Sequence, residues 1–197
     1  MKILGSASYT SKSGKRLSLE GVGTLPDELD FKSLKVEGTI SFDSLTCEHL
    51  KVEGECTGET ISADEISIAG TSNVKSIKAG RSVEIEGTIK AVSIECNEIS
   101  ICSQSGKIEQ LQCKSVRIYN ESDKTSKSMF GFSKRKNTSR VWIKNIRAER
   151  VELQNCEAEF VECKTANVRA NCIIEKLIVE GDCEIATDSK VSEVVRD

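Results

Sequence analysis

The sequence predicts an all-β protein, a right-handed parallel β-helix with about 16–17 residues per turn that one loop insertion interrupts. Three observations predict this fold class. A short motif recurs at a nearly constant step, apolar and polar residues alternate inside each copy, and the composition combines 13 glycines with one proline and 4% aromatic residues. This composition is typical of regular strands joined by permissive corners.

The repeat ends each time at a residue suited to a turn. Its template is apolar, any residue, Ala or Cys, two polar residues, apolar, any, apolar, any, and then Gly or Asn, as in Leu45–Gly54 and Ile61–Gly70. The closing positions follow one another in steps of 17, 16, 16, 17, 16 and 17 along the chain. They are Gly21, Gly38, Gly54, Gly70, Gly87, Ser103 and Asn120. Glycine and asparagine reach positive φ most readily, so we expect a corner at this position.

The segments between the corners are predicted to be β-strands with one buried face. Apolar residues alternate with polar ones in Leu50-Lys51-Val52-Glu53, whereas helical spacing never persists. No Asn-Gly or Asp-Gly dipeptide marks a tight hairpin. Similar units in succession therefore favour a parallel solenoid. A left-handed coil has a hexapeptide period, which is absent here, and parallel connections are usually right-handed.

The repeat divides the chain into five regions. We expect an N-terminal segment at 1–16, the first part of the β-helix at 17–120, the insertion at 121–140, the second part at 141–189 and a C-terminal tail at 190–197. The start has no apolar signal sequence, and no run of about 18 apolar residues occurs. These features favour a cytoplasmic protein, and the net charge of −3 argues against nucleic-acid binding.

Nine cysteines are numerous for a chain in a reducing compartment. One position of the repeat exchanges Cys with Ala, which indicates a small apolar filler. Cys47, Cys96, Cys113 and Cys163 occupy this position. Cys56 lies two residues after a corner, as Ile40 and Ile89 do, and Cys172 and Cys183 are expected to share that position. Seven cysteines are therefore expected inside. Cys102 and Cys156 fall in outward positions and are expected to be surface thiols. No CxxC pair occurs, so neither a metal nor a cofactor is predicted.

Catalysis is not predicted either. The only histidine, His49, occupies an outward position of the repeat shared with Glu65, and no nucleophile motif accompanies it. The β-helical acyltransferases need hexapeptide repeats, and the β-helical lyases need longer turns with a carboxylate-lined metal site. Neither signature is present, so we expect no enzyme and no small-molecule substrate.

The insertion changes the charge of the chain sharply. Residues 121–140 carry six basic and two acidic residues, which gives +4 against −7 for the remainder. A flexible loop, contact with an anionic membrane surface, and docking of a protein partner are all open interpretations. The candidate contact residues for a membrane or a partner are Met129, Phe130, Phe132, Lys134, Arg135 and Lys136.

The repeat resembles that of a known family. Residues 52–70, VEGECTGETISADEISIAG, resemble the pattern V-x-G-x-V-x-G-x-I-x-A-x-x-V-x-V-x-G of the bactofilins, which are bacterial polymer-forming cytoskeletal proteins. The similarity covers about residues 15–120 and 141–187 and is greatest to longer members from Firmicutes. It implies a β-helix that polymerises end to end without nucleotide and organises the envelope, cell shape or motility machinery. Some members have a short apolar and basic membrane-targeting stretch at the N-terminus, and the segment from Met129 to Lys134 is similar in character but internal.

Polymerisation is also reasonable on physical grounds, because a solenoid exposes unpaired backbone and apolar side chains at any uncapped end. We expect a homopolymer or a copolymer with a paralogue, possible association with the inner face of the membrane, and no capping helix. The alternative is a monomeric binding module that docks a partner through 121–140. The candidate polymer contacts are Leu17, Leu19 and Leu25 near one end and Ile174, Leu177, Val179 and Ile185 near the other.

Overall fold

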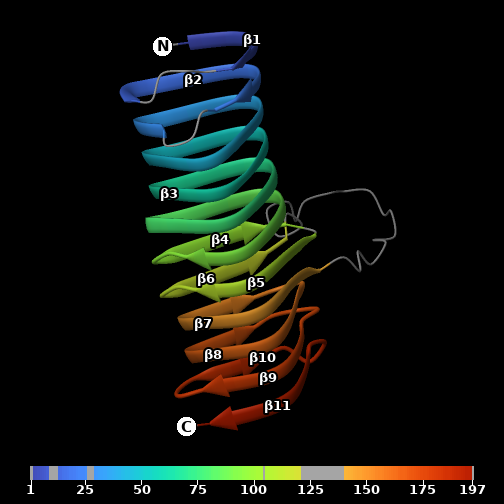
Figure 1. Ribbon diagram of the computed structural model, residues 1–197. Coiled ribbons are helices and arrows are strands. Elements are labelled where there is room, and N and C mark those ends of the chain that lie inside the picture. The colour runs from blue at the N-terminus through green and yellow to red at the C-terminus, as the bar shows by residue number, and fades with distance from the viewer. Residues whose placement is uncertain (1, 9–12, 26–28, 104, 121–139, 197) are drawn as a thin grey trace, which may run out of the picture.

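The computed structural model describes residues 2–8, 13–25, 29–103, 105–120 and 140–196, and all of its regular structure is β. The strands are β1 (Lys2–Ser8), β2 (Ser13–Thr24), β3 (Leu29–Glu95), β4 (Glu98–Cys102), β5 (Gly106–Gln112), β6 (Ser115–Tyr119), β7 (Val141–Leu153), β8 (Cys156–Val168), β9 (Ile173–Val179), β10 (Cys183–Ile185) and β11 (Lys190–Arg196). They coil into a right-handed β-solenoid of about 9 turns (Figure 1). The predicted fold class is confirmed.

The register of the strands confirms the predicted length of most turns. Lys2 pairs with Ser18 and Arg16 pairs with Ser33, so the chain advances by 16 and by 17 between these neighbouring turns. Every pairing between the described strands is parallel, as stacked turns of a coil require. The pairing of β7 with β8 has a shorter step, of only 15 from Val141 to Cys156, which the repeat did not predict.

Glycine closes the corner in the first half of the coil. Gly38, Gly54 and Gly70 have φ of 134°, 136° and 134°, and an added Cβ at Gly54 would lie 2.1 Å from the carbonyl oxygen of Gly38. Both the positive φ and the close approach of the neighbouring turn therefore require glycine. Asn155 and Asn171 adopt positive φ lower in the coil, at 51° and 62°.

The core is a set of side-chain columns that run along the coil. In one column, Val52, Ile68 and Ile85 stack through successive turns, each at most 1% exposed. Burial of each such side chain contributes about 1.5–3 kcal/mol. Because most positions in these columns are apolar on successive turns, the buried core is continuous from Leu17 to Val179.

The coil continues across residues 121–139 without a change of register. Gly106 of β5 pairs with Val141 of β7, and Ser115 of β6 pairs with Arg150 of the same strand. β7 therefore stacks on both β5 and β6 (Figure 1). The ladder of paired strands is thus continuous between the residues that flank the insertion.

The two terminal regions also belong to the coil. β1 lies within the segment 1–16 and stacks on β2, while Lys190–Arg196, expected as a tail, forms β11 on β9. Main-chain pairing thus extends beyond the part of the sequence where the template is recognisable.

Candidate functional site

The outermost turn at the C-terminal end exposes side chains that would be buried elsewhere in the coil. Leu177 of β9 is 0% exposed, whereas Val194, its partner in β11 and a member of the same inward column, is 42% exposed. In a second column, Val168 of β8 is 1% exposed and its partner Ile185 of β10 is 39% exposed. No further described turn covers Val194 or Ile185, so they form an apolar end surface.

The candidate polymer contacts fall into two groups. Leu17, Leu19 and Leu25 are buried near the N-terminal end, where β1 stacks on β2. At the other end the buried residues are Ile174, Leu177 and Val179, which lie in the turn that β11 pairs with. Of the seven residues, Ile185 alone is exposed. Val194, which the sequence analysis did not select, joins it because β11 continues the coil.

Strand edges also remain open at the ends. Among the described residues, β1 and β11 stand first and last in the strand order, and β10 pairs with β8 alone. Each of these strands therefore has a pairing partner on one side within the described chain. Unpaired edges of this kind can add a further strand.

The two cysteines expected on the surface are both buried, so that prediction was wrong. Cys156 is 0% exposed because the shorter turn between β7 and β8 brings it into the inward column of Val141. Cys102 is 5% exposed, next to the corner where Ser103 replaces glycine. The hydroxyl of Ser103 donates to the carbonyl of Ser105 at 2.7 Å, which gives this corner a different local structure.

The seven cysteines expected inside differ in their burial. Cys47, Cys56, Cys96, Cys163 and Cys172 are buried, whereas Cys113 and Cys183 are half-buried. Cys183 pairs with Ala166 and not with the column of Cys56, which corrects its predicted position. Burial raises the pKa of Cys47 and of Cys163 to about 12, and it also raises the pKa of Cys156.

One buried polar residue was missed by the repeat. Ser72 is 0% exposed in the column of Ile40, Cys56 and Ile89. The thiol of Cys56 donates to the Ser72 hydroxyl oxygen at 3.5 Å, so the two side chains satisfy each other inside the coil. The sequence could have predicted its burial, because Ser72 lies two residues after Gly70, and the other residues of this column also lie two residues after a corner glycine.

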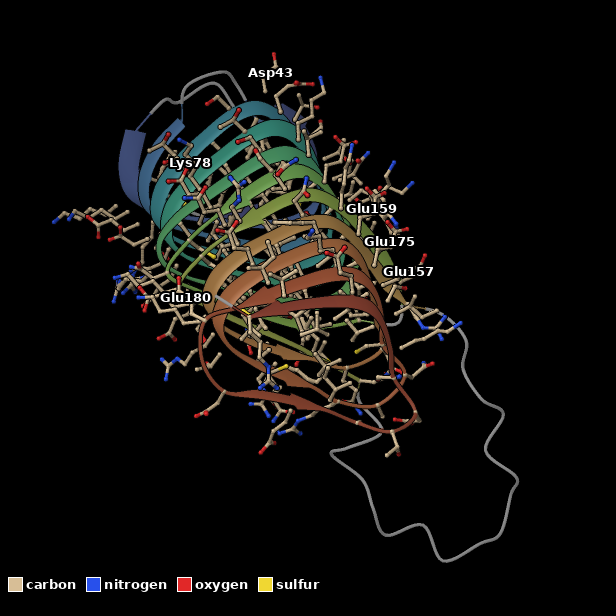
Figure 2. The ribbon with its side chains drawn as sticks, turned by 90° about the horizontal axis from the view of Figure 1, so that it is seen from below. Asp43, Lys78, Glu157, Glu159, Glu175 and Glu180 are labelled. Atoms are coloured by element: carbon tan, nitrogen blue, oxygen red, sulfur yellow. The ribbon has the colours of Figure 1, made fainter. Side chains whose placement is uncertain are left out.

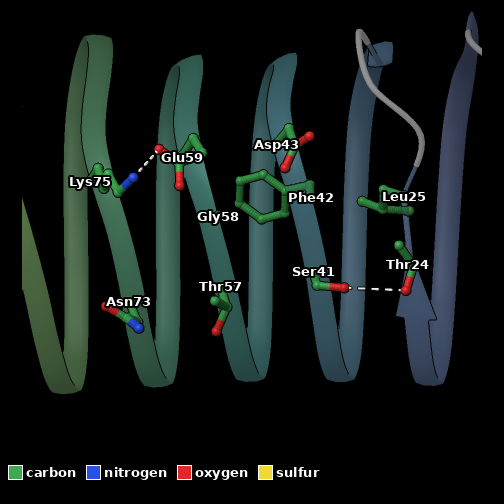
Figure 3. Close-up of a pocket in the computed structure, with 10 residues that line it drawn as sticks. All are labelled: Thr24, Leu25, Ser41, Phe42, Asp43, Thr57, Gly58, Glu59, Asn73 and Lys75. Carbon is green, nitrogen blue, oxygen red and sulfur yellow. Dashed lines mark hydrogen bonds and ion pairs between the residues drawn. The ribbon is translucent and has the colours of Figure 1, made fainter.

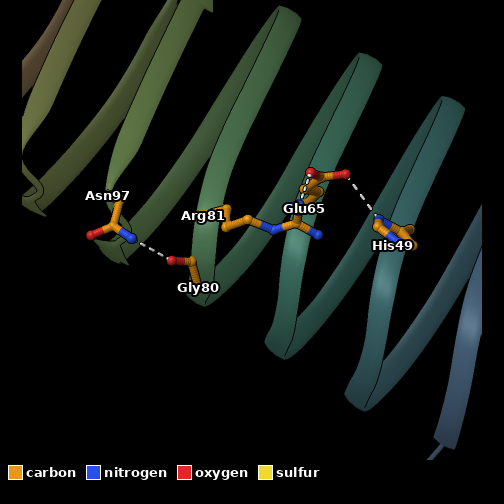
Figure 4. A network of polar contacts seen from close by, with 5 residues as sticks. All are labelled: His49, Glu65, Gly80, Arg81 and Asn97. Atoms are coloured by element: carbon orange, nitrogen blue, oxygen red, sulfur yellow. Dashed lines mark hydrogen bonds and ion pairs between the residues drawn. The ribbon is translucent and has the colours of Figure 1, made fainter.

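His49 lies in a surface ladder of charges. Its Nδ1 is 2.9 Å from Oε2 of Glu65, and Nη1 of Arg81 is 2.8 Å from Oε1 of the same carboxylate (Figure 4). The three residues come from successive turns, and each side chain is about half-exposed. Water and salt screen such pairs strongly, so the ladder contributes little to stability.

The described surface has several grooves. One, of about 390 Å³, lies beside Phe42 where Gly58 leaves room for the ring, and the hydroxyls of Ser41 and Thr24 are 3.2 Å apart there (Figure 3). Figure 2 shows charged side chains projecting around the coil, among them Glu157 and Glu175. Within the described residues, no group of three His, Cys, Asp or Glu side chains is placed to hold a metal ion.

Two aromatic residues stand where the chain leaves and rejoins the coil at the insertion. Arg117 lies over the ring of Tyr119 at 5.1 Å, and Lys107 lies over Trp142 at 5.2 Å. Arg140 also joins the coil through hydrogen bonds to Asn171. The predicted contacts Met129, Phe130, Phe132, Lys134, Arg135 and Lys136 lie outside the described residues, so their role stays a prediction.

Comparison with protein-family models, curated proteins and solved structures gives no match to this chain. In the described residues, no helix has the length and apolar character needed to cross a bilayer. The architecture is therefore established by the repeat and the strand register of the chain itself.

Proposed function

We propose that this protein is a non-enzymatic structural scaffold that polymerises end to end without nucleotide, as the resemblance of its repeat to the bactofilins implies. The end surface of Val194 and Ile185 carries the proposal. Both residues continue columns that are otherwise buried, and both are exposed where the described coil stops.

Stacking of another molecule on this end would bury apolar surface and pair the open edge of β11. Burial of apolar area contributes about 25 cal/mol per Å², and strand pairing adds directionality through the backbone groups. β1 offers another open edge at the opposite end of the same coil (Figure 1). A rod with an open edge at each end can extend along its own axis.

The proposal predicts that charges on the end surface prevent assembly. The purified full chain is concentrated without nucleotide and examined by sedimentation and negative-stain electron microscopy. We expect concentration-dependent filaments for the wild type and their loss in the double variant Ile185→Lys/Val194→Lys. The matched control is Val92→Lys, because Val92 is 48% exposed but lies in the middle of the coil.

Two results would contradict the proposal. The first is a wild-type protein that stays monomeric at high concentration, which would favour a module that docks a partner through 121–140. The second is a double variant that assembles as well as the wild type, which would exclude this end surface from the contact.

A further inference from the structure

Two cysteines lie directly against each other on successive turns of the coil. Glu95 pairs with Gln112, so the next residues, Cys96 and Cys113, occupy equivalent places. The backbone N–H of Cys96 donates to the carbonyl oxygen of Gln112 at 3.1 Å, and that of Cys113 donates to Arg147 at 3.0 Å. Neighbouring strands lie about 4.8 Å apart, within the Cα separation of roughly 4.4–6.8 Å that a disulfide spans.

The backbone at this place lies outside the regular strands. β3 ends at Glu95 and β5 ends at Gln112, so each cysteine stands at the start of a corner. Asn97 fixes the corner after Cys96, because its side chain donates to the carbonyl of Gly80 (Figure 4) and its own carbonyl accepts from Lys114 at 2.9 Å. A corner can shift slightly to bring two sulfur atoms into bonding distance without breaking the ladder.

One of these two cysteines lines a surface groove, and the other is partly exposed. Cys96 lines a groove of about 520 Å³ with Ala79 and Gly80, and Cys113 is half-buried. A second stacked pair provides the contrast, because Glu157 pairs with Ile173 and therefore places Cys156 against Cys172. Those two cysteines are 0% and 1% exposed. The coil thus holds one accessible pair and one sealed pair.

The neighbouring Cys96 side chain and burial both raise the pKa of Cys113. Cys113 therefore keeps its proton near neutral pH. A thiolate is the attacking species in disulfide exchange, which disfavours Cys113 as the first to react. Cys96 lines the groove and is therefore the member placed to meet the small disulfide first.

We propose that Cys96 and Cys113 form a redox-active dithiol that a low-molecular-weight disulfide oxidises to an intramolecular disulfide. The Cys96 thiolate attacks one sulfur of the reagent and releases one small thiolate, which takes up a proton. Cys113 then loses its proton and attacks Sγ of Cys96, which releases the second small thiol. Two protein thiols are oxidised, and one small disulfide is reduced to two thiols.

The bond would join one turn of the coil to the next, shortly before the insertion. Alanine occupies the same column at Ala63, Ala79 and Ala148, so an alanine substitution at either cysteine is compatible with the fold. Single variants can therefore test each half of the reaction separately.

The test uses the reduced full chain in glutathione buffers of increasing oxidised fraction, followed by alkylation and peptide mass spectrometry. We expect loss of two alkylatable thiols and a cross-link between the peptides of Cys96 and Cys113, with fragmentation separating Cys96 from Cys102. Cys156 and Cys172 should stay reduced until urea unfolds the protein. Cys113→Ala should accumulate a mixed disulfide on Cys96, whereas Cys96→Ala should leave Cys113 reduced.

Three outcomes would overturn the inference. They are alkylation of Cys96 and Cys113 throughout the redox range, a cross-link that involves Cys102 or a second molecule, and oxidation of the sealed pair at the same rate as the accessible one. If the dithiol proposal fails, the proposed scaffold function is unaffected, because filament assembly depends on the end surface and is measured in a separate experiment.

Discussion

Single residues set the shape of each corner. The carbonyl of one corner glycine lies beneath the next glycine, with an added Cβ at Gly70 placed 2.0 Å from the oxygen of Gly54. A side chain here faces both a strained φ and a clash with backbone, which cannot move as a flexible side chain can. The glycine column is therefore a requirement of the close stacking of turns and explains why the repeat is visible in the sequence.

Gly54→Ala tests this requirement. We expect a loss of about 3 kcal/mol in the free energy of unfolding, from strain and clash together, measured by urea denaturation. Gly5→Ala is the control, because Gly5 has φ of 89° but nothing within 4 Å of the added Cβ. Strain alone should cost it about 1 kcal/mol. Equal losses in the two variants would show that the clash has no role.

The buried thiols predict how stability depends on pH. Burial raises the pKa of Cys47 to about 12, above the value of about 8.5 for an unfolded cysteine. Above about pH 8.5 the unfolded state releases the proton and the folded state keeps it, so stability falls as pH rises towards 12. At lower pH this thiol has no effect on the pH dependence.

Urea denaturation between pH 9 and 11 in a reducing buffer measures this effect. The wild type should lose about 1 kcal/mol more per pH unit than Cys47→Ala, which lacks the titrating group. Identical slopes for the two proteins would contradict the assignment of a raised pKa to Cys47.

At the scale of the element, a chain of hydrogen bonds closes the lower corner. Arg140 donates from Nη2 to Oδ1 of Asn171 at 2.6 Å and from Nε to the carbonyl of the same residue at 3.0 Å. Asn171 in turn donates to Oδ1 of Asn155 at 2.7 Å. Since both asparagines have positive φ, these bonds stabilise corners that glycine closes elsewhere.

Arg140→Ala should therefore loosen β7 where it begins. We expect a loss of about 1 kcal/mol in the free energy of unfolding and faster hydrogen exchange at Val141, whose N–H donates to Asn155. Lys144→Ala, an exposed change in the same strand, should alter stability by less than about 0.5 kcal/mol. If the two variants behave alike, the Arg140 bonds are dispensable.

At the scale of the whole molecule, the regular period predicted the fold, because the glycine corners and the inward columns repeat at a fixed step. The burial of Cys156 could not be predicted in this way. The corner at Asn155, which has positive φ, uses one residue fewer than the glycine corners do. Cys156 therefore points into the core, although the regular repeat places it on the outside. Of the end surface, the sequence predicted Ile185 but not Val194. The reason is that β11 does not follow the repeat template, although its backbone pairs with β9.

The central claim is that the coil axis of one molecule continues into the next. Diffraction from aligned filaments tests it most directly, because stacked turns repeat about every 4.7–4.9 Å along that axis. We predict a strong reflection at about 4.8 Å on the meridian, parallel to the filament axis. The same spacing on the equator, or the failure of the protein to form filaments at all, would contradict the account.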